Sequence, residues 1–133
     1  MGSGSTRLIR GSMPGSAGPL EVLWQEREGI ESGIVAVVCH PHPLYGGTLN
    51  NKVVHRAASA LHALGAAVLR FNFRGVGESA GSHDRGEGEL DDARAAMRAA
   101  RLRHPRARAW IAGFSFGSWI AARLAAEDRK SVV

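Results

Sequence analysis

The sequence predicts an α/β protein with a mainly parallel sheet that helices cover on both faces. The continuous apolar, largely β-branched run Ile34–Cys39 is typical of a strand buried on both faces, and we interpret Ala66–Phe73 and Ala109–Ala112 as two further buried strands. Amphipathic helical patterns separate these runs, over 50–64 and from Glu87 to just before Pro105. Because buried strands that alternate with helices form parallel sheets, this order of elements predicts the fold class.

Two shorter strand-like runs precede these elements. Between Leu8 and Gln25 they flank a turn rich in glycine, proline and serine over Gly11–Pro19, and Leu20–Trp24 alternates like a strand with one face in water. We expect the two runs to add an antiparallel edge to the sheet. The first buried strand then ends at the loop His40–Gly47.

Helical periodicity marks three segments. Over 50–64 one apolar face is predicted, and Gly65 stands where a left-handed C-terminal cap belongs. The second helix begins acidic and ends basic, as the helix dipole favours, and Pro105 ends it. The third covers 116–126. The residues expected to face the sheet are Val53, Ala57, Leu61 and Leu64 in the first helix, Leu90, Ala93, Met97 and Ala100 in the second, and Ile120 and Leu124 in the third.

Length and composition indicate one small globular domain or a piece of one. The 133 residues are 44% hydrophobic and 22% charged, which is ordinary for a globular chain. The single Cys39 excludes an internal disulfide and fits a reducing compartment. No apolar run approaches the ~20 residues that span a bilayer, and the N-terminus lacks a signal-peptide core. We therefore expect a cytoplasmic protein with no membrane partner, and we interpret the myristoylation-like start, 1–6, as a flexible leader.

The net charge of +5 comes almost wholly from arginine, and five arginines cluster around one helix end. Such a patch can attract nucleic acid. No aromatic residues interleave with it, and no helix-turn-helix, zinc-ligand or RNA-binding signature accompanies it. We therefore interpret it as a solvated helix face and expect no nucleic-acid partner. The five residues are Arg98, Arg101, Arg103, Arg106 and Arg108.

The strongest chemical signal is the G-x-S-x-G pattern of residues 113–117, which lies between a buried strand and a helix. A hydroxyl attacks a carbonyl only if it stands clear of the sheet, near a base and near donors that hold the developing oxyanion. A sharp strand-to-helix turn meets this need, with strained backbone angles at the serine and glycines that let strand and helix approach. The pattern predicts Ser115 as a nucleophile and the amide of Phe116 as an oxyanion donor.

The loop after the first buried strand is expected to supply the other oxyanion donor. Pro41 and Pro43 have no amide hydrogen, which leaves the amides of His42 and Leu44. We favour His42, because it follows the end of the strand by three residues, and keep Leu44 as the alternative.

Three other chemistries are weaker hypotheses. His40 and His42 have a spacing that binds zinc, but no acidic residue or third histidine lies nearby, so we expect no metal. The glycines of 75–80 fit part of a dinucleotide fingerprint, but loop-forming residues follow where a helix should open. Cys39 beside a histidine is a further candidate nucleophile, although a cysteine that closes a buried strand is usually an apolar filler.

Three segments together carry a family resemblance: 37–48, 70–79 and 113–117. They resemble small bacterial α/β hydrolases, in particular predicted hydrolases related to dienelactone hydrolase, and the match spans 20–126. The resemblance implies the α/β-hydrolase fold, a Ser–Asp–His triad and a small-molecule ester or acyl substrate; we expect no cofactor. Many such relatives carry Asp where this chain has Asn72, which removes one possible ionic partner for Arg74.

In this fold the acid and the histidine of the triad follow the serine along the chain. After Ser115 come Glu127 and Asp128 but no histidine. We therefore expect an α/β-hydrolase domain that is truncated after the helix 116–126, with its acid and histidine beyond this chain and no triad catalysis by the chain alone.

The expected organisation has three parts. Residues 1–19 form a leader with the first strand and turn, 20–127 form the N-terminal part of the hydrolase domain, and 128–133 form a non-native tail. The alternative function is a non-catalytic protein of the same fold, used for binding or as a scaffold. The sequence leaves the substrate's identity and the oligomeric state open.

Overall fold

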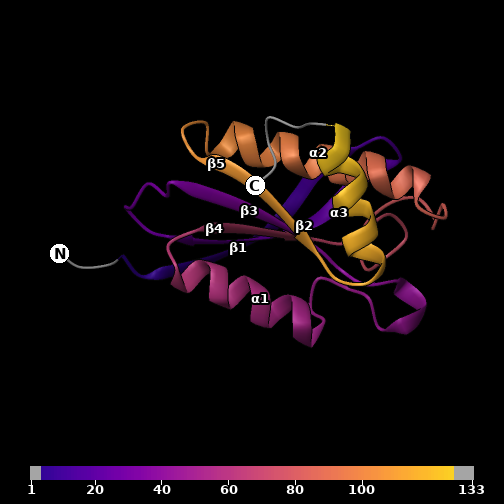
Figure 1. The fold of residues 1–133 in the computed structure, drawn as a ribbon, viewed down its shortest axis with the longest axis horizontal. Helices are drawn as coiled ribbons and strands as arrows, with labels where there is room; N and C mark the ends of the chain where they lie inside the picture. The colour runs from indigo at the N-terminus through magenta and orange to yellow at the C-terminus, as the bar shows by residue number, and fades with distance from the viewer. Residues whose placement is uncertain (1–3, 128–133) are drawn as a thin grey trace.

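A computed structural model describes residues 4–127, and a five-stranded mixed sheet forms its centre (Figure 1). The strand order is β1-β2-β4-β3-β5, in which β3 pairs in parallel with both β4 and β5, while β1–β2 and β2–β4 are antiparallel. The predicted α/β class and the antiparallel edge are confirmed. The strands are β1 (Thr6–Gly15), β2 (Gly18–Arg27), β3 (Ile34–Cys39), β4 (Ala67–Phe71) and β5 (Arg108–Gly113).

The first two strands form a longer hairpin than the sequence predicts. They pair from Thr6 opposite Arg27 to Gly15 opposite Gly18, so the turn is only two residues long and not 11–19. The glycines and prolines of the predicted turn lie in the strands. Pro14 is tolerated because β1 is an edge strand, and Pro19 because it precedes the part of β2 that pairs with β4, which begins at Val22. The buried pair Met13 and Leu20 lies within this extension and ties it to the core.

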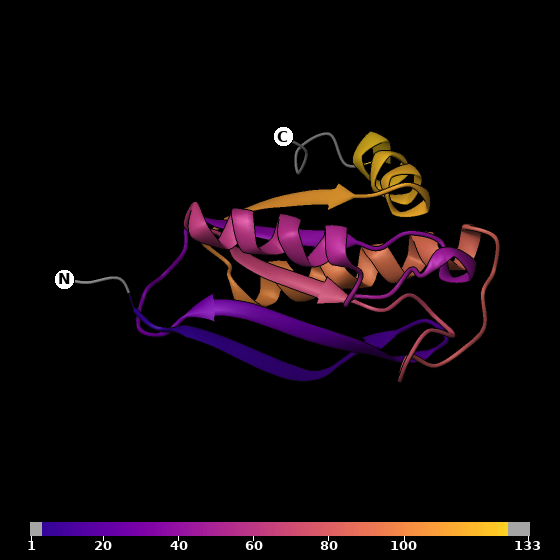
Figure 2. The ribbon, with the colours of Figure 1, turned by 90° about the horizontal axis from the view of Figure 1, so that it is seen from below.

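Helices cover both faces of the sheet. In Figure 2 α1 lies in front of the sheet and α2 behind it. On the α1 side a small cluster packs Val54 and Ala58 against Val38 and Val68. The larger cluster lies on the side of α2 and α3. The helices are α1 (Lys52–Ala63), α2 (Glu87–Arg103) and α3 (Phe116–Glu127), and a short 3-10 turn, η1 (Pro43–Tyr45), follows β3.

The predicted inner face of α1 is wrong by about one residue. Val54, Ala58 and His62 are buried, whereas Val53 is 50% exposed and Leu64 is 85% exposed. The reason is tertiary: His62 contacts the Thr6 hydroxyl at 3.0 Å and the Ala66 carbonyl at 3.3 Å, so a polar residue has partners on the inner face. Sequence periodicity does not show such partners.

The C-terminus of α1 is capped as predicted. Gly65 has φ +104, its N–H donates to the carbonyl of His62, and the N–H of Ala66 donates to that of Leu61. This pair of bonds is a Schellman motif, which satisfies carbonyls that would otherwise be free at the helix end.

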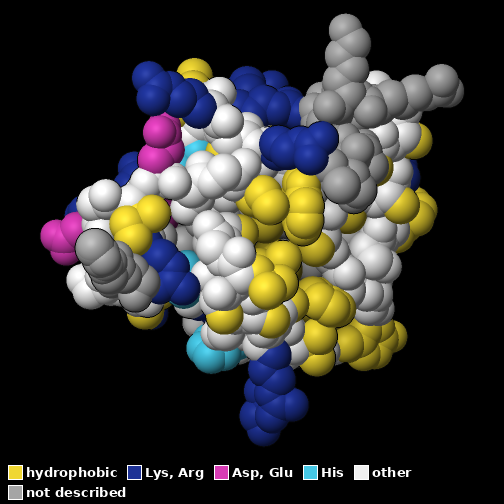
Figure 3. Space-filling view, turned by 60° about the vertical axis from the view of Figure 1, so that its left-hand side comes forward, with side chains coloured by type: hydrophobic (Ala, Val, Ile, Leu, Met, Phe, Trp, Pro, Cys, Tyr) yellow, Lys and Arg dark blue, Asp and Glu magenta, His cyan; other side chains and the backbone are white. Residues whose placement is uncertain are grey.

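The residues predicted to face the sheet from α2 and α3 are buried. The last strand, β5, pairs only with β3 within residues 4–127, so its other edge is open there. Trp110, Ile111 and Ala112 on this strand are partly exposed. Figure 3 shows hydrophobic side chains gathered on one face of the molecule, with Lys and Arg side chains at its border. In the part of the chain that the structure describes, no helix is long and apolar enough to cross a membrane.

Part of the arginine cluster is paired with carboxylates. Arg103 donates to Glu26 at 2.6 and 2.9 Å and lies 5.0 Å above the ring of Trp24. Arg106 contacts Glu31 at 3.4 Å. These pairs lower the net positive charge that this face presents.

Candidate active site

The backbone bends sharply at Ser115, between the end of β5 and the start of α3. Ser115 has φ +54, and within residues 4–127 only Arg85 is another non-glycine residue with positive φ. A side chain in this conformation is strained by roughly 1–2 kcal/mol, so the surrounding packing must enforce it. The serine is exposed, as a nucleophile must be.

Close packing on both sides of the bend explains its two glycines. A Cβ on Gly117 would lie 2.4 Å from the carbonyl oxygen of Cys39 and 2.5 Å from that of His40. A Cβ on Gly113 would lie 2.3 Å from the carbonyl oxygen of Gly117. Only glycine therefore lets the bend pack directly against the end of β3, and this contact brings Ser115 beside the loop that follows β3.

Two backbone amides remain free beside the bend. The N–H groups of His42 and Phe116 make no hydrogen bond within residues 4–127. The N–H of Leu44 instead donates to Nδ1 of His42 at 3.1 Å. The sequence predicts these two amides as oxyanion donors. Because the amide of Leu44 already donates a hydrogen bond, the structure favours the amide of His42 over that of Leu44 as the second donor.

A buried imidazole holds the loop after β3 in place. His40 is fully buried; its Nδ1 contacts the Pro41 carbonyl at 2.7 Å, and its Nε2 accepts the N–H of Phe73 at 3.0 Å. Burial lowers the pKa of His40 to about 4, so the ring is neutral at pH 7. Because both ring nitrogens are occupied, His40 is not available as a zinc ligand. Within residues 4–127, no three acidic, His or Cys side chains are grouped to hold a metal ion.

The loop after β4 supports the site through a polar network. Asn72 accepts the N–H of Leu49 at 2.8 Å and donates to Glu21 at 2.8 Å. The guanidinium of Arg74 forms a bidentate ion pair with the fully buried Asp92, at 2.9 and 3.2 Å. The backbone N–H of Arg74 also donates to this carboxylate. The ionic partner of Arg74 is therefore Asp92, so an asparagine at position 72 leaves this arginine paired.

The model of the alpha/beta hydrolase fold family matches residues 37–133 of this sequence. The chain belongs to this family. The crystal structure of XC6422 from Xanthomonas campestris, described as an α/β serine hydrolase without lid, is 44% identical and superposes with a TM-score of 0.85 over 92% of this chain. An α/β serine hydrolase homologue from Coxiella burnetii is 43% identical, with a TM-score of 0.83 over 97% of the chain. The uncharacterized protein RP471 of Rickettsia prowazekii is 53% identical over 91 residues, which is 68% of the chain.

These relatives are longer than the chain. It spans 57% of the Xanthomonas structure, 60% of the Coxiella structure and 38% of the Rickettsia protein. The matching part of this α/β hydrolase chain contains the strand–turn–helix unit of Ser115 and the loop of His42. The predicted tail, 128–133, lies outside the described residues.

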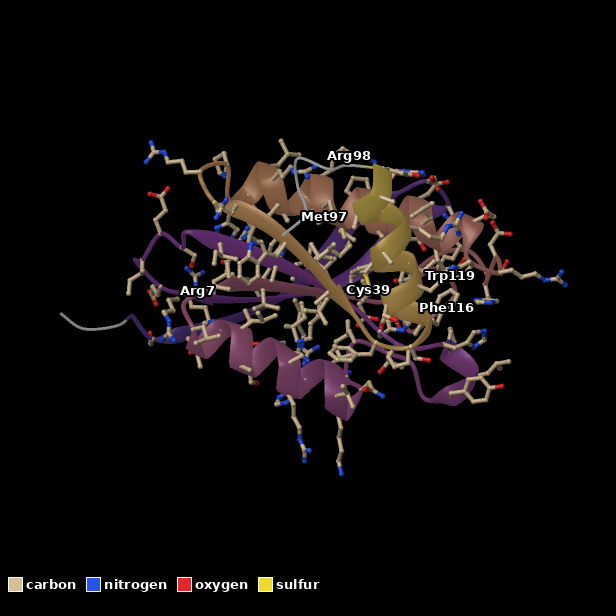
Figure 4. The ribbon with its side chains drawn as sticks, viewed as in Figure 1. Arg7, Cys39, Met97, Arg98, Phe116 and Trp119 are labelled. Atoms are coloured by element: carbon tan, nitrogen blue, oxygen red, sulfur yellow. The ribbon has the colours of Figure 1, made fainter. Side chains whose placement is uncertain are left out.

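A pair of imidazoles lies against the ring of Phe116 and against each other. The ring of His42 lies 5.3 Å from that of Phe116, and the ring of His83 lies 5.6 Å from Phe116 and 4.6 Å from His42. Figure 4 shows Phe116 and Trp119 together at the start of α3. No motif of the sequence predicts a role for His83. The only indication in the sequence is its position in the glycine-rich loop before α2, and this position does not predict which residues its side chain contacts.

Two weaker hypotheses do not fit the structure. Cys39 is fully buried, and burial raises the pKa of its thiol, so it is not an available nucleophile. The glycine-rich loop turns back on itself, since the N–H of Gly75 donates to the carbonyl of Ala80. α2 begins only at Glu87, so no helix opens on these glycines as dinucleotide binding requires.

Proposed function

We propose that Ser115 is the nucleophile of a serine hydrolase that cleaves an ester or another acyl substrate. The histidine and the acidic residue of its triad are supplied from beyond residue 133. The observation that carries the proposal is the exposed Ser115 at φ +54, next to the free amides of His42 and Phe116.

The chemistry follows from this geometry. The triad histidine takes the proton of the Ser115 hydroxyl while its oxygen attacks the substrate carbonyl. The two amides donate hydrogen bonds to the oxygen that becomes negative, and α3 directs the positive end of its dipole to the same point. The histidine then protonates the leaving alcohol, and water cleaves the acyl-serine to release the acid and restore the hydroxyl.

Labelling with a fluorophosphonate tests the proposal on the complete gene product. We expect covalent labelling at Ser115 that S115A abolishes. Ser12 is a matched control, because it is also exposed and lies in β1, away from the bend, so S12A is expected to keep the label. Labelling that survives S115A would refute the nucleophile.

A non-catalytic binding or scaffold protein of the same fold is the competing function. It predicts a folded complete protein that neither labels nor hydrolyses p-nitrophenyl acetate. For the chain of 133 residues alone, we expect no turnover at enzyme-like rates, because without a base the serine hydroxyl stays protonated. Turnover at such rates that depends on Ser115 would place a base inside the chain.

Two finer assignments belong to the same proposal. The three family motifs favour a relationship to dienelactone hydrolase over other branches of the family. The single buried, unpaired Cys39 suits a protein that works in the reducing cytoplasm, and fractionation of the source cell would test this.

A further inference from the structure

We propose that His42 and His83 together bind a hydroxyl group of the substrate, so that this hydrolase prefers esters of 2-hydroxy acids. The inference rests on the proposed function, because it places the substrate carbonyl at Ser115. The proposed function does not specify the acyl group of the substrate, and this inference names its chemical class.

The hydrogen bond from Leu44 sets the tautomer of His42. The backbone N–H of Leu44 donates to Nδ1 of His42 at 3.1 Å. A ring nitrogen that accepts a hydrogen bond carries no hydrogen, so neutral His42 carries its hydrogen on Nε2. The Nε2 atom of His42 is therefore a donor.

Glu89 sets the opposite tautomer in His83. Nδ1 of His83 lies 3.0 Å from Oε2 of Glu89, whose side chain is fully buried. The carboxylate also accepts the N–H groups of Asp84 and Gly86, each at 2.8 Å, so it is fixed in place. Because a carboxylate only accepts, the hydrogen of neutral His83 lies on Nδ1 and its Nε2 is an acceptor.

The two neighbouring rings therefore offer one donor and one acceptor. Their centroids are 4.6 Å apart, and both side chains are partly exposed. Neither Nε2 atom makes a hydrogen bond to another residue of 4–127. A hydroxyl group both donates and accepts, so it matches this pair as neither a simple anion nor a cation does.

The position of the two imidazoles indicates which carbon of the substrate's acyl group carries the hydroxyl. Both imidazoles lie 5.3 and 5.6 Å from the side-chain ring of Phe116, and the backbone amides of this residue and of His42 are the ones expected to hold the carbonyl oxygen. A hydroxyl on the carbon next to the carbonyl lies closest to that oxygen. The acyl group that fits is therefore that of a 2-hydroxy acid.

The kinetic test compares two esters of equal shape in the complete gene product. Methyl lactate carries a hydroxyl where methyl isobutyrate carries a methyl group. We expect the ratio of their kcat/KM values to fall about three- to tenfold in H83F, the range that one lost hydrogen bond gives. H83Q keeps an acceptor and is expected to restore most of the ratio. The control is H55F, the same substitution at an exposed histidine of α1, which is expected to leave the ratio unchanged.

Two kinetic results would overturn the inference. An unchanged ratio in H83F would mean that only water occupies the pair. An equal loss for both esters in H83F and H83Q would make the role of His83 structural.

A binding measurement separates this inference from the proposed function. In the complete S115A protein, the ¹⁵N resonances of the two rings report their tautomers and shift when a ligand binds. We expect hydrogen on Nε2 of His42 and on Nδ1 of His83, and shifts with methyl lactate but not with methyl isobutyrate. Reversed tautomers, or no shift with either ester, would overturn the hydroxyl site. Fluorophosphonate labelling that survives S115A, together with the expected shifts on lactate binding, would instead refute the nucleophile alone.

Discussion

Nε2 of His40 accepts a hydrogen bond from the backbone N–H of Phe73 at 3.0 Å. This single contact joins the loop after β3 to the loop after β4. Its other ring nitrogen contacts the carbonyl of Pro41 at 2.7 Å, directly before the candidate oxyanion amide of His42. The position of that amide therefore depends on a neutral, fully buried imidazole.

The neutral state of His40 predicts a stability that falls in acid. The folded-state pKa is about 4, below the ordinary value of 6.5, so the unfolded chain takes up the proton first as the pH falls. The stabilisation is full above pH 6.5 and is lost between 6.5 and 4, by up to about 3 kcal/mol. Urea unfolding of the wild type and H40N at several pH values checks this. H40N is expected to be less stable at pH 7 and to lose less in acid; equal slopes in both proteins would contradict the assignment.

The left-handed conformation of Ser115 predicts an inverted preference between glycine and alanine. Glycine adopts φ +54 without strain, so S115G is expected to be more stable than S115A by about 1 kcal/mol. At Ala122, an exposed residue in the middle of α3, the order should reverse, with A122G less stable than the wild type by about 1 kcal/mol. Thermal unfolding of the three variants and the wild type measures both differences. The same order at both positions would argue against a strained bend at Ser115.

The contact of Gly117 with β3 predicts a costly alanine. In G117A the new Cβ would lie 2.4 Å from a backbone oxygen of Cys39, so strand and bend must move apart. We expect a loss of at least about 2 kcal/mol and slower phosphonate labelling of Ser115. Gly33 is the control, because a Cβ there meets nothing within 4 Å. G33A is expected to be neutral or slightly stabilising, and a comparable loss in both variants would refute the packing argument.

The pair of Arg74 with Asp92 predicts a large difference between neighbouring acidic residues. D92N leaves the mostly buried guanidinium without its charge partner, at a cost of about 3 kcal/mol. Asp91 is the matched control, since its pair with Arg94 lies in solvent, and D91N should cost less than about 0.5 kcal/mol. Denaturant midpoints compare the two. A small loss in D92N would mean that water enters and solvates Arg74.

Most of the fold could be predicted from local patterns. Apolar runs place β3, β4 and β5 to within two residues at each end, and periodicity identifies the inner residues of α2 and α3. For α1 periodicity was only partly right, since Leu61 packs against the core while Val53 and Leu64 are exposed. Which face packs was decided by partners distant in sequence, such as the Thr6 hydroxyl on His62. The predicted hairpin is too short because glycine and proline usually mark turns, but the edge strand β1 and the end of β2 that does not pair with β4 accept both.

The sequence by itself determined the parts of the site whose chemistry is local. The glycine spacing around Ser115 and the prolines that exclude amides around His42 both follow from the backbone. Only the tertiary structure decided which distant groups meet: His40 with Phe73, Arg74 with Asp92, and His83 with Glu89 beside His42. The physical reason is that a hydrogen bond or ion pair depends on distances of about 3 Å. Such distances between residues far apart in the chain are set by how the sheet and helices pack, which no local pattern records.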